Sequence, residues 1–61
     1  MTWLKAAREA AKIWHLEDDV EETYWKHRND GYPPSDAAHM ACYDWDVYIP
    51  QNILDQITEE E

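Results

Sequence analysis

Cysteine and glycine are almost missing from this chain. Among its 61 residues there is one cysteine, Cys42, and one glycine, Gly31. A single thiol excludes a disulfide within the chain, and no set of Cys and His residues has the spacing of a structural zinc site. One glycine excludes a glycine-rich loop that cradles phosphate. We therefore expect no cofactor, and a lone thiol without a secretory signal indicates a cytoplasmic protein.

Phenylalanine and long apolar runs are also missing. No segment approaches the ~20 apolar residues of a membrane span, so we expect no membrane-crossing helix. The chain does carry four Trp and four Tyr. Disordered acidic segments are poor in aromatic residues, which favours a folded chain. Its length predicts one small domain over residues 1–61, packed largely by these rings.

Positive charge is scarce and unevenly placed. Five Lys and Arg stand against fourteen Asp and Glu, which gives a net charge of −9. Thirteen of the acidic residues follow Leu16, no Lys or Arg follows Arg28, and residues 1–16 are net positive. Such a field repels nucleic acid and anionic membranes and attracts basic surfaces. We expect a basic protein partner, with no direct nucleic acid or membrane binding.

Residues 2–29 have the pattern of a helix. Neither Gly nor Pro interrupts them, four alanines strengthen the helical propensity, and Thr2 can cap the start. Apolar residues recur every three or four positions from Trp3 to Tyr24. Gly31 follows as a candidate left-handed cap.

A second helix could start inside that segment. Asp18 can act as an N-cap, with Glu21 three residues later as its capping-box partner. The alternatives are one long helix or two shorter ones with a bend near Glu17. The unbroken apolar stripe favours continuity or a mild kink.

The second half of the chain is divided by prolines. Pro33 and Pro34 predict a turn, after which Ser35 caps a second helix whose apolar face holds alanines and Cys42. Beyond Pro50, residues 51–57 read as a short third helix; alternatively, residues 47–49 form a brief extended segment. Residues 58–61 are expected to fray, because anions oppose the dipole at a helix C-terminus.

These elements predict an all-α fold, either a helical hairpin or a three-helix bundle with a long first helix and a Pro-Pro turn. The residues expected to dominate its core are Trp3, Ile13, Trp14, Leu16, Val20, Tyr24, Met40, Ala41 and Trp45.

Five carboxylates crowd residues 17–22. At one end of a helix they would be stabilised by its dipole, and on a solvated face they would aid solubility. They could also form a row for a partner to bind, because carboxylates one helical turn apart lie about 5–6 Å from each other. The remaining acids favour this last interpretation, since residues 29–61 contain no Lys or Arg to balance them.

The acids at residues 17–22, 30, 36, 44, 46 and 59–61, on a short helical chain, give the sequence its one resemblance. It resembles small acidic phage-encoded inhibitors, including anti-CRISPR proteins of the DNA-mimic type. The resemblance is to composition, and no family motif is matched. It implies a non-enzymatic protein that blocks the basic DNA- or RNA-binding surface of a host or defence protein.

The candidate partner-binding residues are the exposed acids together with two aromatic residues. Trp25 and Tyr32 could form an aromatic anchor; alternatively, Trp25 covers the Pro33–Pro34 turn. The full set is Glu17, Asp18, Asp19, Glu21, Glu22, Asp30, Asp36, Asp44, Asp46, Trp25 and Tyr32.

Other functions have weaker support. His15, Asp19 and Glu22 share one side of a continuous helix, but no other helix supplies a convincing further metal ligand. The pair His39 and Cys42 lacks the positive setting that activates a thiolate. A helical assembly module that dimerises through its aromatic face is the main alternative to the inhibitor, because small cores often need such help.

Overall fold

The structure, a computed structural model, describes residues 1–59. Every regular element in that range is helical, which confirms the predicted all-α fold. The elements are α1 (Trp3–Ala11), the 3₁₀ helix η1 (Lys12–Trp14), α2 (Glu17–Asn29), α3 (Pro34–Asp44) and α4 (Gln51–Leu54).

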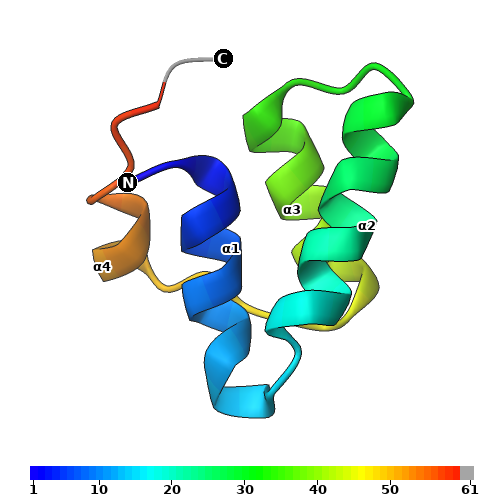
Figure 1. Cartoon of the computed structure of the whole chain (residues 1–61). Helices are drawn as coiled ribbons and strands as arrows, with labels where there is room; N and C mark the ends of the chain where they lie inside the picture. Colours follow the sequence, from blue (N-terminus) through cyan, green and yellow to red (C-terminus); the bar gives the residue numbers. More distant parts are fainter. Residues whose placement is uncertain (60–61) are drawn as a thin grey trace.

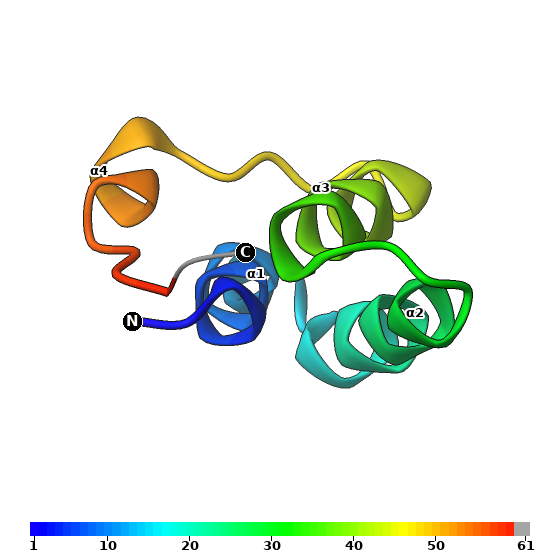
Figure 2. The same ribbon diagram turned by 90° about the horizontal axis from the view of Figure 1, so that it is seen from above.

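Three helices form a small bundle. α1, α2 and α3 each contact the other two, and α4 packs beside α1 (Figures 1 and 2). α2 and α3 make a hairpin that is joined by the predicted Pro-Pro turn (Figure 1). The body measures 27 × 23 × 14 Å along its principal axes. None of the helices described over residues 1–59 is long and apolar enough to cross a membrane.

The first helical segment is two helices, so the preference for one continuous helix was wrong. After η1 the chain reverses at His15, whose φ is 57°. The amide of Leu16 donates to the carbonyl of Ala11 at 3.2 Å, and that of His15 donates to Lys12 at 3.0 Å. This pair of bonds is a Schellman motif, which ends a helix and satisfies its last carbonyls. The apolar stripe continues past this turn because both helices bury one face in the same core.

The same motif ends α2 and α3. It is centred on Gly31, with φ 103°, after α2, and on Asp46, with φ 56°, after α3. The amide of Tyr32 donates to the carbonyl of His27 at 3.3 Å, and that of Val47 donates to Cys42 at 2.8 Å. Of the three left-handed positions, only Gly31 has the residue type, glycine, that adopts this conformation without steric cost.

Two predicted helix caps differ from the structure. α2 starts at Glu17 with no side-chain cap, so the Asp18–Glu21 capping box does not form. The acids of its first turn lie at the positive end of the helix dipole, as the helix-start interpretation required. α3 starts at Pro34, whose fixed φ suits the first helical position, and Ser35 is therefore buried inside the helix rather than capping it. Thr2 does cap α1, accepting from the Lys5 amide at 3.1 Å.

Alanines, rather than aromatic rings, build most of the core. Of the residues expected there, Val20, Tyr24 and Ala41 are buried, and three large side chains are not. Ile13 and Trp14 are 74% and 48% exposed, because they lie in η1 just before the chain reverses. Trp45 is 41% exposed, because it follows the last residue of α3. Trp3, Leu16 and Met40 are half-buried. The buried alanines are Ala6, Ala7, Ala10, Ala11, Ala37, Ala38 and Ala41.

The last helix is shorter than predicted, and residues after it contact the start of the chain. Helix α4 stops at Leu54, and residues 47–49 form the extended segment. The frayed tail stays a prediction, although the Thr58 amide donates to the Met1 carbonyl at 3.0 Å and a Glu59 carboxylate oxygen accepts from the Trp3 amide at 2.9 Å. Residues 60 and 61, which share that prediction, lie outside the described residues.

Candidate partner-binding surfaces

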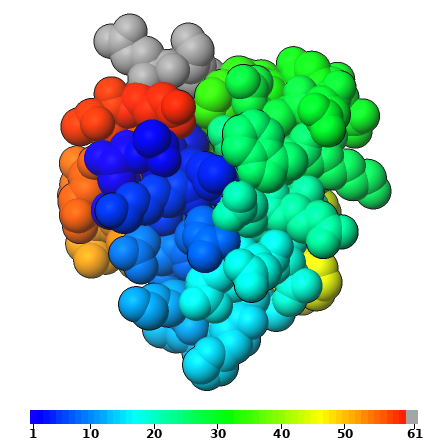
Figure 3. Space-filling model, in the orientation of Figure 1, coloured from blue at the N-terminus to red at the C-terminus, as the bar shows by residue number. Residues whose placement is uncertain are grey.

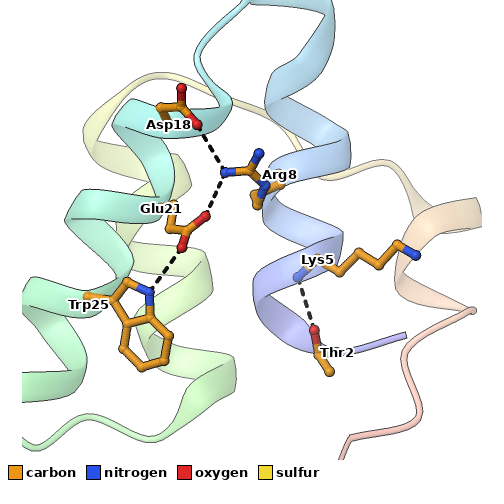
Figure 4. Close-up of polar contacts among 6 residues, drawn as sticks. All are labelled: Thr2, Lys5, Arg8, Asp18, Glu21 and Trp25. Atoms are coloured by element: carbon orange, nitrogen blue, oxygen red, sulfur yellow. Dashed lines mark hydrogen bonds and ion pairs between the residues drawn. The ribbon is translucent and has the colours of Figure 1, made fainter.

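The α2 carboxylates that face α1 meet its positive charges. Nη1 of Arg8 lies 3.2 Å from Oδ1 of Asp18 and 2.6 Å from Oε1 of Glu21 (Figure 4). The bond to Asp18, and then that to Glu21, raises the pKa of the Arg8 guanidinium. The other oxygen of Glu21 accepts a hydrogen bond from the Trp25 indole at 3.3 Å (Figure 4). Arg8 thus links α1 to α2 through two surface ion pairs.

A shallow hollow of about 200 Å³ extends this contact along α1. Its lining includes Glu17 and the three Lys and Arg residues that precede Leu16. We call this side the mixed-charge face, defined by Lys5, Arg8, Lys12, Glu17, Asp18 and Glu21. It belongs to the side on which α1 (blue) and α2 (cyan to green) fill the view (Figure 3).

A different set of carboxylates gathers where α2 passes the end of α3. Nε2 of His27 lies 2.9 Å from Oδ2 of Asp44, and the Trp45 indole donates to the Thr23 hydroxyl at 2.9 Å. Because Asp19 is one turn before Thr23, it lies on the same flank of α2. The fold therefore brings Asp19 towards the α3 end, which also carries Asp46.

The outer side of α3 has only negative charge. We call it the acidic face, defined by Asp36, Asp44 and Asp46. Asp36 is exposed in the first turn of α3, where the helix dipole favours it. Asp44 and Asp46 are exposed at the other end. The chain has no Lys or Arg after Arg28, so no such cation lies on this helix or in the segment that follows it.

The remaining predicted acids lie apart from one another. Glu22 is exposed on α2, and Asp30 is exposed as the last cap residue of that helix. Within residues 1–59, Asp19, Glu22, Asp30, Asp36 and Asp46 form no ion pair. The predicted acids thus divide into those used by the fold and those left free.

Trp25 and Tyr32 are both exposed, at 47% and 42%, but the fold does not bring them together. The Trp25 ring meets Tyr24 edge-on at 5.0 Å, whereas Tyr32 meets His27 at 6.1 Å. Trp25 and His27 are two positions apart on α2, and side chains with that spacing do not face each other. The two rings therefore present separate surfaces.

Sequence reasoning missed an apolar groove beside α3. Tyr43 is 82% exposed and Tyr48 is 72% exposed. Tyr43 lines two adjoining hollows, one of about 310 Å³ that reaches Tyr48 and Leu54, and one of about 420 Å³ that reaches Met40. The signal was present in the sequence: alanines and Cys42 mark the inner side of α3, so Met40 and Tyr43 had to face outward.

The thiol beneath this groove is inert. Burial raises the pKa of Cys42 to about 11, so the thiol stays neutral at physiological pH and is a poor nucleophile. Nδ1 of His39 lies 2.8 Å from the carbonyl oxygen of Ser35, and this geometry assigns the proton to that nitrogen. Over residues 1–59, no three His, Cys, Asp or Glu side chains are grouped closely enough to hold a metal ion.

Comparisons with protein-family models, with curated proteins and with solved structures find no match to this chain.

Proposed function

We propose that this protein is a non-enzymatic inhibitor that occupies the basic DNA- or RNA-binding surface of a larger protein. The observation that carries the proposal is the acidic face, where carboxylates are exposed on a folded helix that itself carries no Lys or Arg. An ordinary soluble surface mixes both signs of charge, as the mixed-charge face does. Free carboxylates at Asp19, Glu22 and Asp30 extend the negative surface across α2.

Carboxylates on a helix can imitate a phosphate backbone. Duplex DNA carries one negative charge per ~1.7 Å of axis, counting both strands, and carboxylates on successive helical turns repeat about every 5–6 Å. Carboxylates at that spacing have about a third of the charge density of DNA, so a groove built for DNA would meet charge of the same sign at lower density on this protein. The protein would then act as a phage-encoded inhibitor of the DNA-mimic or anti-CRISPR type, in the host cytoplasm.

An affinity capture from host lysate tests this function. Immobilised protein should retain a nucleic-acid-binding protein at low salt and release it with added duplex DNA or high salt, because the two polyanions compete. A variant that carries Asp19→Asn, Asp36→Asn and Asp46→Asn should retain less. Glu9→Gln, on an exposed α1 residue, is the control and should behave as the parent chain. Retention that ignores both DNA and salt contradicts the proposal.

A second candidate is an assembly module that forms a homodimer through aromatic side chains. The exposure of Trp14, Trp25, Tyr43 and Tyr48 favours it, since exposed rings are common at interfaces. Sedimentation velocity over a wide concentration range separates the two functions. The inhibitor sediments as a monomer throughout, whereas the assembly module shifts to a dimer as concentration rises.

A further inference from the structure

The groove beside α3 is lined by two exposed tyrosine rings and by half-buried apolar side chains. We define it by Met40, Tyr43, Tyr48 and Leu54, which line its two adjoining hollows. Buried Val47 and Ile49 anchor the extended segment on either side of Tyr48, so that this ring points outward. Hollows of about 310 and 420 Å³ are in the size range of sites that receive a large side chain.

Two carboxylates of α3 lie along this groove: Asp44 lines one hollow, and Asp36 lies one helical turn before the lining residue Met40. Asp36 lies four residues before Met40 and seven before Tyr43, which places all three along one side of α3. Asp44 lines the hollow beside Tyr43, and its side chain stays 48% exposed while it contacts His27. Asp44 follows Asp36 by eight positions, a rise of about 12 Å along the helix.

This arrangement favours a basic partner over a second copy of the chain. In a two-fold dimer the same patch meets itself, so Asp36 and Asp44 would face the carboxylates of the other copy. A net charge of −9 on each chain adds to that repulsion. A segment with positive ends and an apolar middle would instead match the charge of both carboxylates and fill the groove.

We propose that the groove beside α3 binds a basic amphipathic helix of the target. Its Lys or Arg residues would stand about seven or eight positions apart, two helical turns, to reach Asp36 and Asp44. A large apolar residue between them would enter the space between Tyr43 and Tyr48. This inference rests on the proposed function for its choice of a basic target and adds the element of that target which is recognised.

A synthetic peptide tests the groove without knowledge of the target. The probe is a helical peptide of Lys, Leu and Ala, with lysines about seven positions apart and leucines between them on the same side. A scrambled peptide of the same composition removes the apolar stripe. NMR amide shifts should move at Met40, Tyr43, Tyr48 and Leu54 with the first peptide. The scrambled peptide should bind at least about tenfold more weakly.

Matched variants separate the groove from general charge attraction. Tyr43→Ser with Tyr48→Ser should weaken the ordered peptide about tenfold, as loss of aromatic anchors does at interfaces, and leave the dependence on salt intact. Ile13→Ser removes an equally exposed apolar side chain away from the groove and should leave affinity unchanged. Circular dichroism checks that all variants keep the parent helix content.

Two results would overturn the inference: equal binding of both peptides, or peptide shifts confined to residues 17–22 of α2. Shifts at the groove that follow protein concentration without peptide would assign it to a second copy and reject the basic helix. The proposed function fails separately. If the lysate experiment shows no competition with DNA while the tyrosine variant loses the peptide, the groove stands and nucleic-acid mimicry does not.

Discussion

Carboxylates have different roles on the mixed-charge face and on the acidic face. On the mixed-charge face, Arg8 binds Asp18 and Glu21 and ties two helices together (Figure 4). On the acidic face, Asp36 and Asp46 have no ion-pair partner within the described chain. Sequence clustering alone does not separate these roles, because residues 17–22, the densest cluster, contain both acids that Arg8 pairs and acids that form no ion pair within residues 1–59.

The comparison teaches that the position of the few cations decides which acids remain available. Three of the five Lys and Arg lie before Leu16, so the acids that fold against α1 are the ones that become paired. α3 packs against α1 and α2 through small side chains and leaves its outer carboxylates in solvent.

The largest effect should come from enlarging the inner side of α3. Ala41 is fully buried, and Ala41→Leu should lower the free energy of unfolding by about 3 kcal/mol, because a packed core cannot accept the added volume. Tyr43→Leu, two positions away and exposed, should change it by less than about 0.5 kcal/mol. Urea unfolding followed by tryptophan fluorescence measures both. Equal losses would show that the outer side of α3 is also part of the core.

Neutralising carboxylates on the acidic face should weaken target binding more than neutralising those on the mixed-charge face. Asp36→Asn with Asp46→Asn should weaken a captured target about tenfold at low salt, from two exposed charges of up to about 1 kcal/mol each. Asp18→Asn with Glu21→Gln should weaken it less than about threefold, because Arg8 already occupies those acids. Surface plasmon resonance at several salt concentrations provides the affinities. If the α2 pair dominates, the two faces have been assigned the wrong way round.

Removing the guanidinium of Arg8 should disrupt the ion pairs of the mixed-charge face and leave the acidic face unchanged. Arg8→Gln should lower the urea midpoint, by less than the core substitution does, because Asp18 and Glu21 lose the guanidinium that joins them. The loss should shrink as salt rises. Lys5→Gln, on the same helix and exposed, is the matched control. A loss of equal size for Lys5 would mean that the bridge contributes only general charge.

Alkaline pH should destabilise the fold through Cys42, which is buried in the core. Burial raises the pKa of this thiol from 9.0 to about 11, so the folded state favours the neutral form. The stabilisation is complete below pH 9 and is lost as pH rises towards 11, because the unfolded thiol ionises first. Burial raises the pKa of Tyr24 as well, with the same sign. Thermal melts from pH 8 to 11 should fall more steeply for the parent chain than for Cys42→Ala.

The smallest effects should come from the left-handed turns. His15→Gly and Asp46→Gly should each raise stability by about 0.5 kcal/mol, since the relief of a left-handed backbone exceeds the entropy that glycine adds to the unfolded chain. Asp46→Gly should also weaken target binding, while His15→Gly should not. Chemical denaturation and the affinity assay separate these two consequences. A loss of stability in both variants would contradict the assignment of backbone strain.

Local signals in the sequence predicted much of the fold. Helical propensity, the Pro-Pro turn and the single glycine located the all-α hairpin, and Thr2 and Gly31 act at helix ends as expected. The break at His15 was close to the bend considered near Glu17, but the unbroken apolar stripe favoured a continuous helix, because a histidine marks a left-handed turn far less clearly than a glycine. The reversal also explains why Ile13 and Trp14, which continue the apolar pattern of α1, emerge into solvent.

The negative charge of the candidate site could be predicted from the sequence, but the positions of its side chains in the fold could not. The excess of acids after Arg28 could be read directly from the sequence. Which acids would be paired depended on the angle between α1 and α2, which local patterns do not specify. The groove was missed because large rings were assigned to the core, whereas the close helix contacts are filled by alanines and leave Tyr43 and Tyr48 outside.

The alanine core has a consequence for how such a protein can change over generations. Its helices are held together mainly by alanines that cannot be replaced by larger residues without overpacking, so the interior tolerates few substitutions. The exposed rings and free carboxylates contribute little to that interior, and most can be replaced without unfolding the chain. Mutation can therefore alter the exposed surface while the scaffold stays fixed, an advantage if the protein is the proposed inhibitor and its target is under selection to escape.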